Sequence, residues 1–276
     1  TEIWRFIAGM SATSFVSFFL TQADRIILSK ILSLDLFGYY NLAKTLSNGL
    51  SMIGAQITKA LFPRFSSLLA GEDQTSLRIL YHKSTQLITV TVLPIAIVVA
   101  LFSKELVLLW TQDIIVATNT ALITSLLMLG TSLNALVSIP YHLSVAYGWT
   151  SLGFIQNLFS IIFIVPLMIF LSIQFGGAGA ALTWLVLNMA YFIFMPKVVH
   201  SRILKGELSN WYRVDIGLPL LFTLFVSGSG RWLVPSSLPT QYLIPAILLV
   251  GFLSVGAATL LAPDIRCWIG HQIKNL

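Results

Sequence analysis

The sequence predicts an all-α membrane protein, a bundle of about eight transmembrane helices. Hydrophobic residues make up 57% of the 276 residues, charged residues make up 9%, and the mean hydropathy is +0.88. Several apolar runs approach 20 residues, which is the length a helix needs to cross the hydrocarbon core. None of these runs alternates as a barrel strand does. Since backbone in lipid must satisfy its own hydrogen bonds, we expect helices.

Eight apolar segments follow one another, separated by short polar connections. The longest connections, about residues 62–84 and 200–215, are too small to hold a catalytic domain. The expected segments are Phe6–Ile31, Phe37–Leu61, Thr85–Phe102, Thr118–Ala146, Ser151–Ile173, Ala178–Val199, Ile216–Val234 and Tyr242–Leu261.

The distribution of Lys and Arg predicts the orientation in the membrane. Three of these residues lie within segments, three on the outer side and ten on the side of the N-terminus. Such an excess marks the cytoplasmic side, so we expect both termini in the cytoplasm of a multi-pass inner (cell) membrane protein. The ten are Arg5, Arg64, Arg78, Lys83, Lys197, Arg202, Lys205, Arg213, Arg266 and Lys274; the outer three are Lys30, Lys104 and Arg231.

Several functional classes are excluded. The net charge of +6 does not indicate a nucleic-acid partner, because no soluble domain is available to hold a basic patch. A single cysteine, Cys267, excludes disulfide and cysteine-based metal frameworks. No HExxH, Cys/His cluster or phosphate loop is present, so we expect neither an enzyme nor a cofactor.

Asp24 and Arg25 are the most informative charged residues, because they lie inside the first apolar segment. Lys44 lies inside the second. A charge at the centre of the bilayer costs about 2.5–3.5 kcal/mol on insertion scales, so it faces a partner or a wet cavity. Asp24 and Lys44 each lie about seven residues from the outer end of their segments, or about 10 Å at 1.5 Å per residue. We therefore expect the three side chains to meet, either as structural glue or as part of a functional site.

Polar stripes extend this candidate site along two further stretches. Lys44, Asn48 and Ser51 share one face of the second segment, while Asn134 and His142 share one face of the fourth. His142 is interpreted either as a gating or proton-relaying residue or as an interior histidine with satisfied hydrogen bonds. These residues predict a wet cavity lined by the first, second and fourth segments.

The charge of that cavity indicates its substrate class. Asp24 is the only acidic residue that the sequence places deep in a segment, against Arg25, Lys44 and Lys59. Lys59 lies at the inner end of its segment, where a lysine snorkels to the interface. A cationic cavity attracts an anion such as a phosphate or pyrophosphate head group and repels organic cations.

Four short strings resemble polysaccharide-repeat-unit flippases of the Wzx type. These are the O-antigen and exopolysaccharide transporters of the multidrug/oligosaccharidyl-lipid/polysaccharide exporter superfamily. The resemblance covers about residues 6–199. The strings are Asp24-Arg-Ile-Ile-Leu-Ser29, Phe37-Gly-Tyr-Tyr-Asn-Leu-Ala43, Leu61-Phe-Pro-Arg-Phe-Ser66 and Phe175-Gly-Gly-Ala-Gly-Ala-Ala181.

The resemblance implies an architecture and an activity. Such flippases have two six-helix lobes around a central cavity, sometimes with two extra helices. Residues 1–199 would then be the second lobe, and residues 200–276 the extra pair with a short cytoplasmic tail. Because the chain begins with Thr1 rather than Met, we expect a fragment of a longer protein that acts with a missing N-terminal lobe or a second copy.

By the same resemblance, the whole protein flips an undecaprenyl-pyrophosphate-linked oligosaccharide across the inner membrane by alternating access. This activity serves O-antigen, lipopolysaccharide or exopolysaccharide biosynthesis. Arg25 and Lys44 would hold the pyrophosphate, with Asp24 as partner or ion-coupling carboxylate. The expected partners are membrane lipids, the lipid-linked oligosaccharide, and the polymerase and chain-length proteins.

Two other functions are weighed against the flippase. A polysaccharide polymerase or ligase would need a large outer loop carrying arginines, whereas the outer loops hold three Lys/Arg in all. A cation-coupled multidrug exporter would need buried carboxylates to dominate the cavity, and the sequence offers Asp24 alone.

Overall fold

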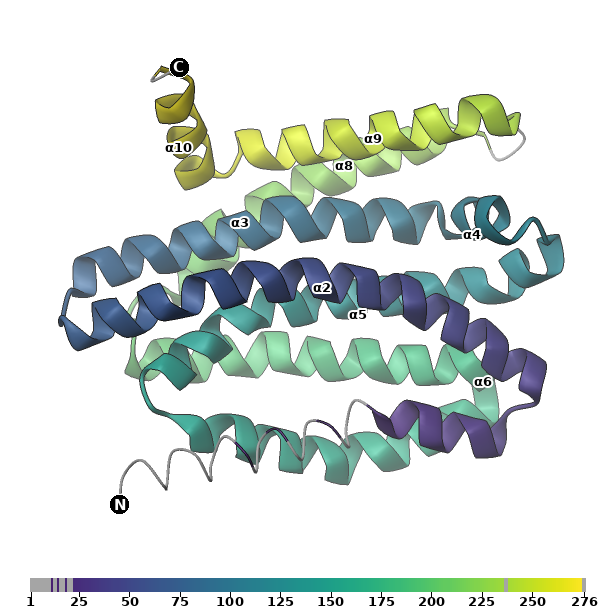
Figure 1. Cartoon of the computed structure of the whole chain (residues 1–276), viewed down its shortest axis with the longest axis horizontal. Coiled ribbons are helices and arrows are strands. Elements are labelled where there is room, and N and C mark those ends of the chain that lie inside the picture. The colour runs from purple at the N-terminus through teal and green to yellow at the C-terminus, as the bar shows by residue number, and fades with distance from the viewer. Residues whose placement is uncertain (1–10, 12–13, 15–17, 19–21, 236–237, 275–276) are drawn as a thin grey trace.

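The structure is a computed structural model that describes residues 11, 14, 18, 22–235 and 238–274, with the side chains of Thr240 and residues 269–274 excepted. These residues are helical apart from short connections, and long helices run side by side along the molecule (Figure 1). Residues 22–31 form a helical stretch before the first labelled helix. The elements are α2 (Leu34–Ala70), α3 (Gln74–Leu101), α4 (Ser103–Thr111), α5 (Ile114–Ala146), α6 (Thr150–Arg202), α7 (Leu208–Asn210), the π-helix η1 (Trp211–Gly217), α8 (Leu218–Leu233), α9 (Thr240–Leu260) and α10 (Pro263–Lys274).

The chain is an all-α membrane protein. Five described helices are long and apolar enough to cross a bilayer: α3, α5, α6, residues 208–233 and Gln241–Leu260. α2 is 37 residues long but carries lysines and arginine along its length and is not among the five. The part of the expected segment Phe6–Ile31 that precedes residue 22 lies outside the described residues, except at positions 11, 14 and 18.

α6 consists of two antiparallel arms, as the two predicted segments Ser151–Ile173 and Ala178–Val199 require. Gly176 breaks the helix with φ +59° and ψ −137°, a conformation that favours glycine. A Cβ on Gly179 would collide with the backbone of Leu171, and one on Gly177 would lie 2.9 Å from Ile123. The glycine run therefore makes a tight reversal and brings α6 close to α5.

The longest predicted connection is itself largely helical. Residues 62–84 were expected to be a loop, but α2 continues to Ala70 and α3 begins at Gln74, leaving a turn of three residues. Asp73 caps α3 by accepting a hydrogen bond from the backbone N–H of Ser76 at 3.0 Å. The length of an apolar run underestimates the length of these helices, because their ends carry polar residues.

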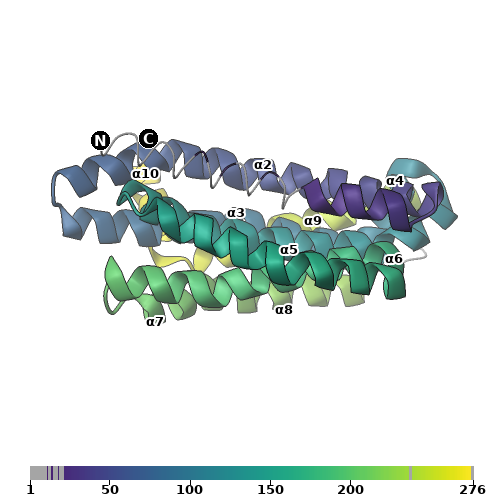
Figure 2. The ribbon, with the colours of Figure 1, turned by 90° about the horizontal axis from the view of Figure 1, so that it is seen from below.

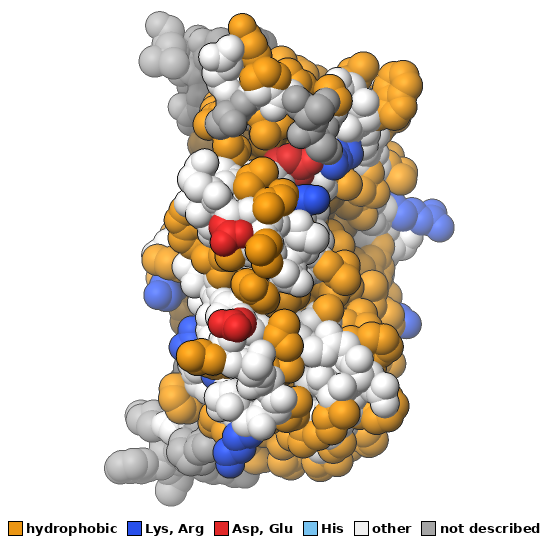
Figure 3. Space-filling model, turned by 90° about the vertical axis from the view of Figure 1, so that its right-hand side faces the viewer, with side chains coloured by type: hydrophobic (Ala, Val, Ile, Leu, Met, Phe, Trp, Pro, Cys, Tyr) orange, Lys and Arg blue, Asp and Glu red, His pale blue; other side chains and the backbone are white. Residues whose placement is uncertain are grey.

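α8 and α9 lie along one edge of the bundle, and the arms of α6 lie toward the opposite edge (Figures 1 and 2). The hydroxyls of Ser227 and Ser254 lie 2.8 Å apart between α8 and α9. α10 turns across the end of this pair and bonds to α3, where the side-chain oxygen of Gln86 accepts from the backbone N–H of Asp264 at 2.9 Å. Figure 3 shows hydrophobic side chains over much of one end of the bundle, with charged side chains scattered among them.

We predict that Gly130→Ala loosens the contact between α5 and α6. A Cβ on Gly130 would lie 2.7 Å from Trp184 and 3.1 Å from the Leu185 Cα. Overpacking of this kind costs about 1–3 kcal/mol of unfolding free energy, measurable by denaturant titration in mixed micelles. The matched control is Gly251→Ala in α9, where a Cβ meets nothing within 4 Å. An unchanged unfolding midpoint in Gly130→Ala would contradict the packing.

Candidate functional site

Asp24 is the most heavily bonded charged group near the predicted site. It is 4% exposed, and its carboxylate accepts three hydrogen bonds. The donors are the Tyr40 hydroxyl, the Lys44 Nζ and the backbone N–H of Arg25, each at 2.7 Å. The predicted meeting of Asp24 with Lys44 is therefore found, but the carboxylate pairs with the lysine and not with the Arg25 guanidinium.

The helical geometry explains why these groups converge. A short turn at residues 32–33 folds the helical stretch 22–31 back beside α2. Tyr40 and Lys44 are four residues apart on α2, so both project from the same face toward Asp24. The side chain of Lys44 is 14% exposed, and its Nζ lies 4.9 Å from the ring centroid of Trp184 on α6. The lysine is thus held between a carboxylate and an indole face.

A polar cavity of about 230 Å³ opens beside this pair. Its walls come from the helical stretch 22–31, from α2, from α5 and from the second arm of α6. Its lining residues are Gln22, Arg25, Lys44, Ser47, Asn48, Ser51, Thr131, Asn134 and Trp184. We call this the cationic cavity, because Arg25 and Lys44 are the charged residues among its described lining.

Arg25 has an exposed side chain that faces the cationic cavity. Within the described ranges its guanidinium has no carboxylate partner, whereas Lys44 is paired with Asp24. Asp24 therefore offsets one of the two positive charges and Arg25 remains available to a ligand. Arginine suits this position, because it stays charged and its planar fork matches the oxygens of a phosphate.

The floor of the cavity is a hydrogen-bonded polar layer. The hydroxyls of Ser47 and Thr131 lie 2.6 Å apart, and the Trp184 indole N–H donates to Thr131 at 3.2 Å. The Asn134 amide donates to Asn188 at 2.8 Å. These bonds fix Trp184 and Asn134 in place, so the polar groups of the cavity are held before any ligand binds.

His142 lies outside the cationic cavity, which corrects its predicted place. Eight residues separate it from Asn134, or about 12 Å along α5. It lines a second cavity of about 260 Å³ with Asn134, Tyr141, Gln156, Asn157 and Tyr191 among others. The Nδ1 of His142 is 2.7 Å from the Ser138 carbonyl oxygen. Asn134 lines both cavities and so connects His142 to the predicted site.

The structure also corrects the expectation that Asp24 is the only deep carboxylate. Asp215 is 1% exposed and lies 2.6 Å from His82, while Glu105 is 5% exposed and accepts from Arg231 at 2.7 Å. Their burial follows from tertiary packing, since both lie next to the ends of apolar runs. Neither lines the cationic cavity.

The predicted site omits several residues found here, among them Tyr40, Ser47 and Trp184. Tyr40 had a usable signal, because it lies one helical turn before Lys44 on the same face. Ser47 lies three residues after Lys44 and had the same signal. Trp184 had none, since the segment containing it is far away in sequence and reaches the cavity only through the packing of α6 against α5.

We predict that Asp24→Ala lowers the free energy of unfolding by about 3 kcal/mol, because it leaves Lys44 without its counter-charge. Adding Lys44→Met to Asp24→Ala should recover more than half of that loss, since an apolar side chain needs no partner. Unfolding in mixed micelles, monitored by tryptophan fluorescence, measures both effects. The pairing would be contradicted if the double variant lost as much unfolding free energy as Asp24→Ala and Lys44→Met lose when measured singly and added together.

Comparisons with known proteins give matches to polysaccharide biosynthesis and transport proteins. A family model described as "Polysaccharide biosynthesis protein" matches residues 1–113. A putative O-antigen transporter of Shigella flexneri is 26% identical over 183 residues, which cover 66% of this chain and 43% of the relative. The lipopolysaccharide biosynthesis protein WzxC of Escherichia coli strain K12 is 23% identical over 235 residues, which cover 81% of this chain and 46% of that relative. The matches thus span less than half the length of these curated relatives, and neither relative's name describes an enzyme.

Proposed function

We propose that this chain takes part in flipping undecaprenyl-pyrophosphate-linked oligosaccharide repeat units. Its matches support membership of the polysaccharide flippase family at modest identity. The movement crosses the bacterial inner membrane and serves O-antigen or exopolysaccharide biosynthesis. The observation that carries the proposal is the cationic cavity, where Arg25 and Lys44 face a polar space among apolar helices. The proposed role is transport and involves no bond making or breaking.

The chemistry of the cavity suits a pyrophosphate with a sugar attached. Arg25 offers a forked donor to phosphate oxygens, and the Lys44 ammonium adds a second positive charge. Asn48, Ser51 and Asn134 supply the neutral donors and acceptors that sugar hydroxyls need. The Trp184 face adds a flat apolar surface against which a sugar ring packs.

Asp24 gives this site a means of release. Its carboxylate competes with a phosphate for Lys44, because both are anions within reach of one ammonium. Protonation of Asp24, or binding of a cation to it, would free Lys44 for the substrate, and the reverse change would weaken binding. We therefore propose Asp24 as the partner of Lys44 and as the coupling carboxylate of an alternating-access cycle.

The proposed assembly follows from the same reasoning. Residues 1–199 would form one transporter lobe, and residues 200–276 two additional helices and a cytoplasmic tail; α8 and α9 pack on each other and on α3. A first lobe or a second copy would close the cationic cavity from its open side. The ten-to-three excess of Lys and Arg supports cytoplasmic termini. A polymerase and chain-length proteins would receive the product.

The packing of the other carboxylates favours this function over cation-coupled drug export. Asp215 and Glu105 are buried but already hold His82 and Arg231, and neither reaches the cationic cavity. Export of an organic cation would need an unpaired carboxylate in that cavity, and the described lining residues include none.

We predict that Arg25→Ala and Lys44→Ala each lower repeat-unit export by about tenfold or more, since each removes a charged hydrogen-bond donor to the pyrophosphate. The variants are made in the full protein that contains this chain, in a strain whose surface polysaccharide depends on it. Surface polymer, lipid-linked repeats in the inner leaflet and protein level are measured together. Lys59→Ala is the control, because Lys59 is an exposed cation of α2 that does not line the cavity.

Accumulation of lipid-linked repeats on the inner leaflet is the expected defect. Single repeats exported but not polymerised would instead indicate a polymerase. Wild-type export in both Arg25→Ala and Lys44→Ala at normal protein level would refute the assigned site.

A further inference from the structure

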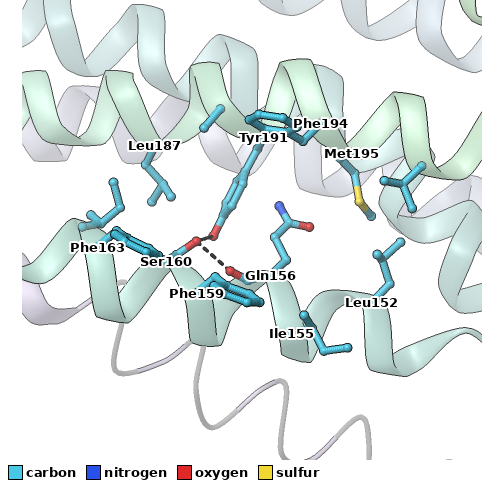
Figure 4. A pocket seen from close by; sticks show the side chains of 13 residues that line it. Leu152, Ile155, Gln156, Phe159, Ser160, Phe163, Leu187, Tyr191, Phe194 and Met195 are labelled. Carbon is cyan, nitrogen blue, oxygen red and sulfur yellow. Dashed lines mark hydrogen bonds between the residues drawn. The ribbon is translucent and has the colours of Figure 1, made fainter.

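A deep apolar groove of about 480 Å³ runs between the two arms of α6. Its first wall includes Leu152, Ile155 and Phe159, and its second wall includes Phe194 (Figure 4). Ala190 also lines the second wall. Of the thirteen described residues that line it, three are polar and ten are apolar. A groove of this composition in a membrane holds hydrocarbon, because a water-filled one would leave aromatic and aliphatic side chains wet.

The groove exists because the two arms pack closely at one end and less closely at the other. Near the hairpin, Ile164 and Leu187 form a buried contact between the arms. Further from it, the small side chain of Ala190 leaves space, and Phe194, 64% exposed, forms part of the outer rim. The groove therefore follows from the spacing of small and large residues along α6.

The inner wall of the groove is polar and is shared with the second cavity. Gln156 and Tyr191 line both spaces. The Tyr191 hydroxyl is 2.7 Å from Ser160, drawn in Figure 4, and donates to Asn157 at 3.2 Å. Asn134 then lines both the second cavity and the cationic cavity. Shared wall residues thus link an apolar groove to a cationic site through a space of mixed polarity.

We propose that this groove binds the polyprenyl tail of the lipid-linked substrate. The inference rests on the proposed function of the cationic cavity and adds a second subsite to it. The tail lies between the arms of α6, its first isoprene units pass beside Gln156 and Tyr191, and the pyrophosphate reaches Arg25 and Lys44. An ordinary phospholipid fits less well, because its head group stays at the membrane surface and does not reach those cations.

The length of the groove along the helix agrees with this occupant. Its residues 152–164 cover about 18 Å of helix, close to the thickness of one leaflet of hydrocarbon. In the orientation proposed above, the 147–149 connection before α6 lies on the cytoplasmic side, so the groove opens into the inner leaflet. Because Arg25 and Lys44 lie nearer the outer ends of their segments, the tail extends from the pyrophosphate toward the inner leaflet, as in a substrate whose head group has already moved outward.

Photocrosslinking locates the tail directly in the unmodified protein. The full protein in nanodiscs is irradiated with an undecaprenyl phosphate that carries a diazirine on its chain, and cross-linked peptides are identified by mass spectrometry. We expect labels on residues 152–163 and 190–198, competed by undecaprenyl pyrophosphate and not by phosphatidylglycerol. Labels confined to α8 and α9, or labels competed equally by phosphatidylglycerol, would overturn the proposal.

Filling the groove tests it by affinity. Ala190→Trp should weaken binding of undecaprenyl pyrophosphate by about fivefold, through lost van der Waals contact with the tail. It should leave binding of inorganic pyrophosphate unchanged. Met189→Trp is the matched control, since Met189 lies at the same depth, is 46% exposed and does not line the groove.

The two proposals fail in different ways. Equal affinity of Ala190→Trp and Met189→Trp for undecaprenyl pyrophosphate would overturn the tail groove and leave the cationic cavity intact. Unchanged inorganic pyrophosphate binding in Lys44→Ala would instead count against the proposed function.

Discussion

The ion pair between Lys44 and Asp24 is the constraint around which the candidate site is built. Two opposite charges in an apolar bundle are tolerated because they lie 2.7 Å apart and because Tyr40 and a backbone N–H satisfy the remaining carboxylate positions. The pair ties the helical stretch 22–31 to α2 at a fixed register. It also holds Lys44 at the wall of a polar cavity, so the interaction that stabilises the helices also places a cation where an anion can bind.

The hairpin at Gly176 is the second feature that the site requires. It reverses α6, so that Trp184 returns toward α5 and Lys44, while the space between the arms opens as an apolar groove. One reversal therefore shapes both the end of the site that suits a phosphate and the end that suits a hydrocarbon tail. Amphiphilic lipid-linked substrates present both chemistries in one molecule, and this arrangement offers a surface for each.

Particular residues show how far sequence reasoning reached. Asp24, Arg25, Lys44, Asn48, Ser51 and Asn134 lie on polar faces that helical periodicity predicts, and the structure groups them at one ion pair and one cavity. His142 shares the face of Asn134 and lines the second cavity with it, but it lies too far along α5 to line the cationic cavity. Periodicity predicts direction around a helix well, whereas position along it depends on tilt and on neighbouring helices. Asp215 and Glu105 escaped notice, because a residue beside the end of an apolar run is buried only when other helices cover it.

Composition and periodicity are enough to identify this chain as a helical membrane protein with scarce intramembrane charges. Hydrocarbon imposes helices of a certain length and makes each buried charge costly, and both effects can be recognised in composition and periodicity. The packing of helices against one another is needed to pair Asp24 with Lys44 and to leave Arg25 facing the cavity. The same packing places Trp184 in the cavity wall and opens a groove between the arms of α6. These outcomes depend on how helices distant in sequence pack together, and side-chain contact across helices is not encoded in the periodicity of any single one.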